Sequence, residues 1–416
     1  SLAGATAPMW GCGLLGPLPG IFSDGTTTSD MQEMIDGLKV TSAFGKTHYW
    51  NWNLAPQVIN GTMQYLTKDF IFMPEQWGVG VVNEEWVRTG GQSGFLDSSG
   101  NPTPAEMGTI LLGANEPDMY GSCMGGMMGS CTAPCPSAAN CPVCHLEATP
   151  GSEQPNSFGQ CDCWSDSHAT GVGFWPLSST HCSGISQPLP TLWTDYPDCG
   201  DDVISLWRQT AAIAASKGYT YLSTPLAAVS MDYLRSFIEK ACTGCSDVSC
   251  GCPTHVAWHF YANDCRPAST GGYDNFQAKL DATAKIMEDF PFIQGAIVNE
   301  VGMLNCAMDT PSSACVPNGP TQQYPADQQP DNSCPSTAEL PNGLASFVED
   351  LLGMVAATTT SDGRQVVSSF SWFNENMDGG TYNLRLFSED GSVNQVGEAY
   401  INSCQAWAST AKGIVV

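Results

Sequence analysis

Basic side chains are scarce in this sequence. Lys and Arg number 14 in 416 residues, against 41 Asp and Glu, which gives a formal net charge of −27. Contacts with phosphate groups depend on Lys and Arg, so this composition argues against nucleic acid and membrane lipid as partners. A neutral substrate suits such a surface.

Long apolar segments and phosphate-binding loops are also missing. No apolar run approaches the ~18–20 residues that cross a bilayer, so we expect no membrane-spanning segment. No Gly-rich loop follows the first predicted strand, at residues 9–12. The absence of such a loop argues against an open, doubly wound sheet that binds a dinucleotide. We expect no cofactor.

Cysteine, by contrast, is abundant. The 19 cysteines include a dense group from Cys123 to Cys199, which predicts a segment held by disulfide bonds and an oxidising compartment. The first residue, Ser1, fits the removal of a signal peptide. We therefore expect a secreted protein. Because the number of cysteines is odd, at least one thiol lacks a partner within the chain, and the isolated Cys12 is the expected one.

Short segments rich in β-branched and aromatic residues alternate with helical patterns along the chain. The first helical pattern begins with a capping box at Ser29. About eight strand–helix units predict an α/β fold, the (β/α)8 TIM barrel, as one catalytic domain over residues 1–416. The strands are expected at residues 9–12, 47–52, 70–73, 108–114, 219–223, 255–261, 292–299 and 365–373.

Two segments interrupt this alternation. Residues 119–200 are rich in Cys, Gly and Pro, and residues 305–341 are rich in Pro, Asn and Gln. Both follow predicted strands, so we interpret them as loop insertions at the carboxyl end of the barrel, where active sites are built. Cys141, Cys144 and His145, with two further histidines, have a superficial likeness to a zinc site. Disulfide bonds are favoured there, and no metal is expected.

One predicted strand runs directly into Asn115-Glu116-Pro117. This places a carboxylate at the carboxyl end of the strand, with an amide beside it. Hydrolysis of a glycosidic bond needs one carboxylic acid to protonate the leaving oxygen and a second carboxylate opposite it. Asn115 is suited to hydrogen-bond a sugar hydroxyl. The alternative is an ordinary helix cap or turn.

A second apolar strand, at residues 292–299, leads to Glu300. Glu116 and Glu300 are 300 − 116 = 184 residues apart. Without roughly 80 inserted residues, about 100 remain, which corresponds to three strand–helix units of ~31 residues. The spacing therefore predicts two glutamates three strands apart, facing each other across the mouth of the barrel.

The order of these motifs resembles glycoside hydrolase family 128, a family of clan A, over about three quarters of the chain. The resemblance implies a retaining hydrolase of β-1,3-glucan, with Glu116 as acid/base and Glu300 as nucleophile. The family more often has Thr where this chain has Asn299. The matching segments are Tyr49-Trp50-Asn51-Trp52, Phe72-Met73-Pro74, Trp77-Gly78, Leu111-Leu112-Gly113, Asn115-Glu116-Pro117-Asp118, Thr224-Pro225, His259-Phe260-Tyr261, Asn299-Glu300 and Phe370-Ser371-Trp372-Phe373.

The resemblance also implies residues that bind the substrate. His259 and Tyr261 are expected to line the site, with Tyr261 a donor to Glu300, although both could be ordinary residues at a strand end. Four tryptophans are candidates for stacking on sugar rings, and each could instead belong to the core. They are Trp50, Trp52, Trp77 and Trp372.

Three functions are compatible with these residues. The first is a monomeric, secreted β-1,3-glucanase that acts on a polysaccharide without a cofactor. The second keeps the two glutamates but acts on another β-linked polysaccharide, such as xylan or mannan. The third is a barrel that binds glycans without cleaving them, although the presence of both carboxylates argues against it.

Overall fold

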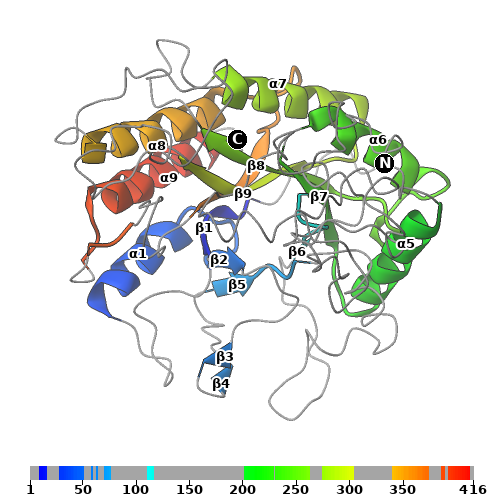
Figure 1. Cartoon of the computed structure of the whole chain (residues 1–416), viewed down its shortest axis with the longest axis horizontal. Helices are drawn as coiled ribbons and strands as arrows, with labels where there is room; N and C mark the ends of the chain where they lie inside the picture. Colours follow the sequence, from blue (N-terminus) through cyan, green and yellow to red (C-terminus); the bar gives the residue numbers. More distant parts are fainter. Residues whose placement is uncertain are drawn as a thin grey trace, which may run out of the picture. The chain divides into compact units, whose positions relative to one another are not determined.

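The computed structural model describes the parts of the chain from which the strands and most of the helices are built (Figure 1). These parts are residues 9–15, 28–50, 58–59, 62–63, 70–75, 110–116, 201–228, 230–262, 274–303, 340–373, 386–388 and 392–412. The predicted insertion 119–200 lies outside the described residues, as do Trp52, Trp77 and residues 305–339 of the second predicted insertion, 305–341. The last two residues of that insertion belong to a helix instead.

Eight strands form one sheet, in the order β5-β2-β1-β10-β9-β8-β7-β6. Their registers are parallel. The chain that leaves β5 continues to Glu75, which forms a parallel bridge with Leu112 directly after β6. The predicted α/β barrel fold is therefore confirmed. The strands are β1 (Gly11–Leu15), β2 (Thr47–Trp50), β5 (Phe70–Phe72), β6 (Ile110–Leu111), β7 (Tyr221–Ala227), β8 (His255–Ala262), β9 (Gly295–Met303) and β10 (Val367–Trp372).

Helices follow the strands in the alternation that parallel pairing requires. They are α1 (Ser29–Lys39) after β1, α5 (Asp201–Ser216) after β6, α6 (Met231–Cys242) after β7, α7 (Asp274–Asp289) after β8, α8 (Leu340–Ala357) after β9 and α9 (Gln395–Lys412) after β10. A small antiparallel pair, β3 (Val58–Ile59) and β4 (Thr62–Met63), follows β2.

The first helix is capped one residue earlier than the sequence predicts. Thr28 has an extended backbone, and its side chain accepts a hydrogen bond from the backbone N–H of Met31. Ser29 is the first helical residue, so the predicted capping box at Ser29 is wrong. Thr and Ser are both favourable N-cap residues. Because Thr28 and Ser29 are adjacent, the sequence alone does not decide which of them caps the helix.

The chain divides into two compact units. One consists of residues 1–51, 56–73 and 259–416, and the other of residues 52–55 and 74–258. Each unit is considered by itself below. A single catalytic domain over residues 1–416 stays a prediction.

In the first unit, the contacts of large side chains distinguish the two faces of the sheet. Phe260 of β8 packs on Phe276 of α7, with ring centroids 4.9 Å apart. Phe370 of β10 packs on Tyr400 of α9 at 6.3 Å, and Trp372 on Phe347 of α8 at 5.8 Å. These residues lie on the outer face, which the helices cover. Because side chains alternate along a strand, their direct neighbours point to the opposite, inner face.

A histidine occupies the inner face beside β1. The Nε2 atom of His48 lies 2.9 Å from the hydroxyl oxygens of both Ser369 and Ser371. A Cβ atom on Gly13 would lie 2.0 Å from that nitrogen, so this position has to be glycine. Complete burial lowers the pKa of His48 from 6.5 to about 3. The imidazole is therefore neutral near pH ~7, as an uncharged part of the core.

Three disulfide bonds join described cysteines. Cys12 in β1 is bonded to Cys404 in α9, across a sequence separation of 392 residues. The expectation that Cys12 is unpaired is therefore wrong. Cys404 is 392 residues away in the sequence, so the spacing of the cysteines does not indicate that it pairs with Cys12. The other two bonds, Cys242–Cys252 and Cys245–Cys250, close the short connection between α6 and β8.

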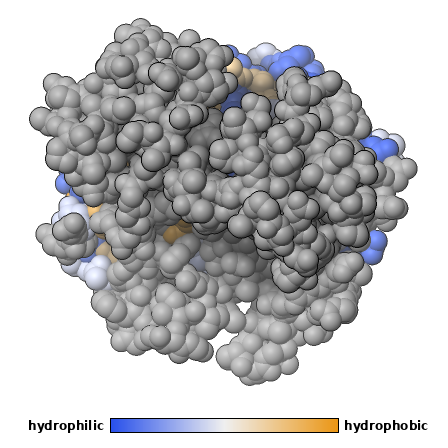
Figure 2. Space-filling view, viewed as in Figure 1, coloured by the Kyte–Doolittle hydropathy of each residue, from blue (hydrophilic) through white to orange (hydrophobic). Residues whose placement is uncertain are grey.

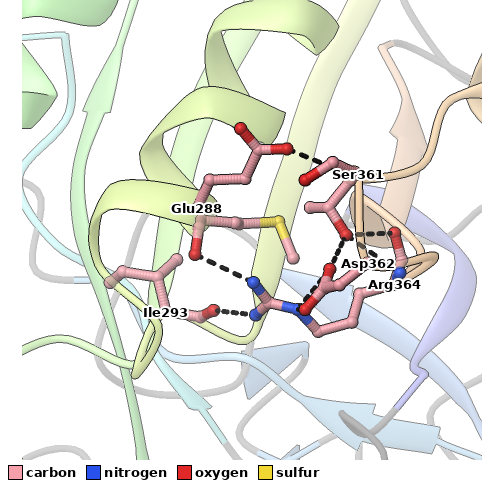
Figure 3. Close-up of polar contacts among 7 residues, drawn as sticks. Glu288, Ile293, Ser361, Asp362 and Arg364 are labelled. Carbon is pink, nitrogen blue, oxygen red and sulfur yellow. Dashed lines mark hydrogen bonds and ion pairs between the residues drawn. The ribbon is translucent and has the colours of Figure 1, made fainter.

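An arginine fastens the turn that precedes β10 to the end of α7 (Figure 3). The Arg364 guanidinium pairs with the carboxylate of Asp362 at 3.0 Å. It also donates hydrogen bonds to the carbonyl oxygens of Met287, at 2.9 Å, and Ile293, at 3.2 Å. Both carbonyl groups lie where α7 leads into β9, so the side chain fixes the start of two neighbouring strands.

Exposed apolar side chains are few in the described part of the chain. Val40 and Phe292 are the large ones, with 51% and 40% of their surface exposed. The described residues visible at the edges of the face in Figure 2 are largely hydrophilic. Among the helices that the structure describes, none is both long and apolar enough to cross a membrane.

Candidate active site

An irregular register in β9 determines the direction of two predicted site residues. Val298 lies opposite Phe370 of β10, and Val301 lies opposite Trp372. The interval is three residues on β9 but two on β10, so β9 contains a β-bulge. Phe370 and Trp372 are on the outer face, and the two valines are therefore on that face as well. The residues between them, Asn299 and Glu300, both point to the inner face.

Glu300 is held by two ring side chains from β8. The Tyr261 hydroxyl donates a hydrogen bond of 2.7 Å to Oε2 of Glu300. The Nδ1 atom of His259 lies 3.2 Å from the same oxygen. Glu300 is 4% exposed and His259 is fully buried. The expected hydrogen bond from Tyr261 to Glu300 is present, and it fixes one oxygen of the carboxylate.

The two residues that hold Glu300 are themselves supported within the first unit. Phe260, which lies between them in β8, is on the outer face, so His259 and Tyr261 both point to the inner face. The Tyr261 ring packs edge-on against Phe373, with centroids 5.5 Å apart. The Lys279 ammonium donates to the backbone carbonyl of His259 at 3.0 Å. These contacts orient both rings toward the carboxylate.

In the second unit, the strand that begins as β6 extends to Glu116. Asn115 forms a parallel bridge with Leu226 of β7, and the N–H of Glu116 donates to the carbonyl of Leu226 at 2.9 Å. Glu116 is 2% exposed. Its backbone φ is 45°, in the left-handed region that residues other than glycine rarely adopt. Such a backbone costs of order 1–3 kcal/mol and is typical of functional sites.

The neighbouring strand bends where it passes β6. Between Ser223 and Leu226, β7 has one residue more than the matching part of β8, which forms a bulge at Thr224 and Pro225. The Thr224 hydroxyl accepts the N–H of Ala257 at 3.0 Å, in place of a regular ladder bond. A Cβ atom on Gly113 would lie 2.5 Å from the carbonyl oxygen of Thr224. Glycine at 113 thus lets β6 approach the bulge closely and continue to Asn115 and Glu116.

Asn115 is 3% exposed, and its Oδ1 atom has no hydrogen-bond partner among the described residues. A buried carbonyl without a partner fits the predicted role in binding a sugar hydroxyl, which stays a prediction. Glu75 is a third buried carboxylate that the sequence reasoning missed. It lies three residues after β5, so the same search for acidic residues after apolar strands would have found it.

The two described tryptophan candidates lie on different faces of the sheet. Trp50 is two residues beyond His48 in β2 and therefore points to the inner face, toward the carboxyl end of the strand. Trp372 is on the outer face, fully buried against Phe347. This packing favours the core alternative for Trp372. The stacking roles of Trp52 and Trp77 concern residues outside the described part of the chain.

Together, the fold and these residues define an α/β-barrel protein with buried carboxylates in strands at the end where barrel active sites are found. Glu300, His259 and Tyr261 belong to one compact unit, and Asn115 and Glu116 to the other. The arrangement of each unit is described, and the pairing of Glu116 with Glu300 stays a prediction.

No family model and no curated protein matches this chain. Several solved structures of glycoside hydrolase family 128 are similar to it. An endo-beta-1,3-glucanase of subgroup II from Sorangium cellulosum is 16% identical, with 94% of this chain and 98% of that chain covered and a TM-score of 0.46. The subgroup II endo-beta-1,3-glucanase from Pseudomonas viridiflava is 12% identical, with coverages of 94% and 97% and a TM-score of 0.44.

A third similar structure is an oligosaccharide-binding protein of subgroup VII from Trichoderma gamsii. It is 14% identical, with 97% of this chain and 98% of that chain covered and a TM-score of 0.42. All three proteins belong to the family that the sequence motifs resemble. The cleavage of beta-1,3-glucan is the activity named for the first two proteins, and the binding of oligosaccharides is the activity named for the third.

Proposed function

We propose that this protein is a retaining glycoside hydrolase that cleaves β-1,3-glucan, with Glu300 as the nucleophile and Glu116 as the acid/base. The observation that carries the proposal is the environment of Glu300. Its carboxylate is buried on the inner face of the sheet, and one oxygen accepts the Tyr261 hydroxyl at 2.7 Å. A nucleophilic carboxylate has to be held in one orientation, and the contacts of Tyr261 and His259 with Glu300 support that requirement.

In the first step, Glu300 attacks the anomeric carbon while Glu116 gives its proton to the leaving glycosidic oxygen. A covalent glycosyl ester on Glu300 results, and the first sugar fragment leaves. In the second step, Glu116 takes a proton from water, and the resulting hydroxide displaces Glu300. The reaction needs only two carboxyl groups and water.

The burial of Glu116 supports its part in this scheme. An acid/base has to exchange a proton with the substrate, and a site that excludes water keeps that proton from leaking to the solvent. Glu116 is 2% exposed, at a strand end whose backbone is strained. Asn115, next to it, offers an amide for a hydroxyl of the bound sugar. The choice of β-1,3-glucan rests on the resemblance of the sequence motifs to glycoside hydrolase family 128.

We also propose that the enzyme is secreted and acts as a monomer. Three disulfide bonds among the described cysteines support an oxidising environment. The scarcity of Lys and Arg suits an uncharged polysaccharide as the partner.

The test is an assay of new reducing ends with laminarin, xylan and mannan. The wild-type protein is compared with Glu300→Gln and Glu116→Gln, which keep the shape of each side chain but remove its charge. We expect activity on laminarin that both substitutions abolish. Activity on xylan or mannan but not on laminarin would show that the substrate is another β-linked polysaccharide, and the proposed roles of Glu116 and Glu300 would remain. Binding of laminarin without cleavage would support the glycan-binding alternative, and activity that survives Glu300→Gln would refute the nucleophile.

A further inference from the structure

The side chain of Asn299 has no polar partner among the residues that the structure describes. Its exposed fraction is 0%, and neither its amide nitrogen nor its carbonyl oxygen forms a hydrogen bond with any described residue. A buried amide without partners costs about 1–3 kcal/mol per unsatisfied group. A Leu of nearly the same volume would avoid this cost. A residue that destabilises the protein at this position therefore needs another reason to be there.

The bulge in β9 determines where this amide points. In a regular strand, the residue before Glu300 would point to the opposite face, toward the helices. The three-residue interval from Val298 to Val301, against two residues on β10, instead brings Asn299 to the same face as Glu300. Bulges often re-aim a side chain next to an active site. Here the bulge presents an unpaired amide beside a carboxylate that is already held by Tyr261.

The described residues near Glu300 include two ring side chains that approach its carboxylate and one apolar ring. Tyr261 donates to Glu300, His259 lies within 3.2 Å of it, and Phe373 packs on the Tyr261 ring. An amide offers two N–H donors and one acceptor oxygen. A sugar hydroxyl, which is both a donor and an acceptor, is the complementary group that would arrive with the substrate.

We propose that Asn299 is a specificity-determining residue, whose amide hydrogen-bonds hydroxyl groups of the sugar bound at Glu300. This inference rests on the proposed function. Among the described residues the amide has no hydrogen-bond partner, and the hydroxyl groups of the bound sugar supply partners for it. Sites built in this way reject sugars that lack the matching hydroxyl, because the buried amide is then left unpaired.

The first test is Asn299→Leu, measured for both stability and activity. Removal of an unsatisfied polar group should leave the midpoint of unfolding unchanged or raise it. The kcat/KM for the polysaccharide that the wild type cleaves should fall roughly 10- to 100-fold, because the hydrogen bonds to the sugar are lost. A variant that loses stability while the folded fraction keeps its kcat/KM would show a structural role and overturn the proposal.

Ser369→Ala is the matched control. Ser369 is also a buried polar residue on the inner face, but its hydroxyl is paired with His48 at 2.9 Å. Its removal should lower the midpoint of unfolding and leave kcat/KM unchanged. Asn299→Ala is the second variant, in case the branched Leu side chain does not fit beside Glu300. The same loss of kcat/KM in its folded fraction supports the proposal, and an unchanged value contradicts it.

Binding separates this proposal from the proposed function. The affinity of a laminarin oligosaccharide is measured by calorimetry for Glu300→Gln and for the double variant with Asn299→Leu. We expect the double variant to bind at least ~10-fold more weakly, and equal affinities would overturn the role of Asn299. If the wild type cleaves none of the polysaccharides, the proposed hydrolase activity fails, while this comparison still decides whether Asn299 contacts a sugar.

Discussion

The burial of His48 on the inner face leads us to predict how the free energy of unfolding changes in acid. Burial lowers the pKa of His48 in the folded protein to about 3, from 6.5. Below pH ~6.5, the unfolded chain therefore binds a proton that the folded protein excludes. Stability contributed by the neutral imidazole is present above pH ~6.5 and is lost as the pH falls from there to about 3. The full contribution of His48 to the free energy of unfolding is about 5 kcal/mol, and about 3 kcal/mol of it is lost between pH ~7 and pH ~4.

The substitution His48→Gln removes the titrating group and keeps an amide that reaches the Ser369 and Ser371 hydroxyls. The free energy of unfolding, measured by denaturant titration at pH ~7 and pH ~4, should fall by about 3 kcal/mol less in the variant than in the wild type. His255, whose pKa burial also lowers to about 3, should show the same effect independently in His255→Gln. If the variants lose as much stability as the wild type over this pH range, the account of the neutral histidines is refuted.

Three further predictions concern the site and its supports. Tyr261→Phe should lower kcat about 10- to 100-fold with little change in the melting temperature, because it removes one hydrogen bond to a charged carboxylate; an unchanged kcat would contradict the role of the hydroxyl. Replacement of both Cys12 and Cys404 by Ala should cost roughly 2–5 kcal/mol. That cost should exceed the cost of removing the Cys245–Cys250 bond, whose separation is 5 residues against 392. Arg364→Met should lower stability by about 1–3 kcal/mol in denaturant titrations and leave kcat/KM unchanged; a loss of kcat/KM in the folded fraction would show that the turn before β10 affects the site.

The barrel could be predicted from the sequence because its strands are buried on both faces. Such strands appear as largely apolar runs, and Phe370-Ser371-Trp372-Phe373, with a single serine, is one of them. The same property hides which face a side chain occupies. Ser371 lies on the inner face and Trp372 on the outer face, although both belong to one motif. The sequence therefore located the strand, and it could not tell a stacking platform from a core tryptophan.

The site was only partly accessible to sequence reasoning. Glu116 and Glu300 are candidates because each follows an apolar run in the sequence, but β9 continues past Glu300 to Met303 instead of ending before it. The reason is the bulge, which depends on the register with β10 and leaves no local sequence signal. For the same reason, the sequence does not indicate the direction of the Asn299 side chain, and this residue differs from the Thr that the resembled family more often has there.

The configuration of the first product tests the central claim most directly. Proton NMR of laminarin during the first minutes of cleavage distinguishes the α and β anomers of the new reducing end before they equilibrate. A nucleophilic Glu300 inverts the anomeric carbon twice, so the account predicts that the β anomer forms first. Initial formation of the α anomer would mean direct attack by water and would contradict Glu300 as the nucleophile.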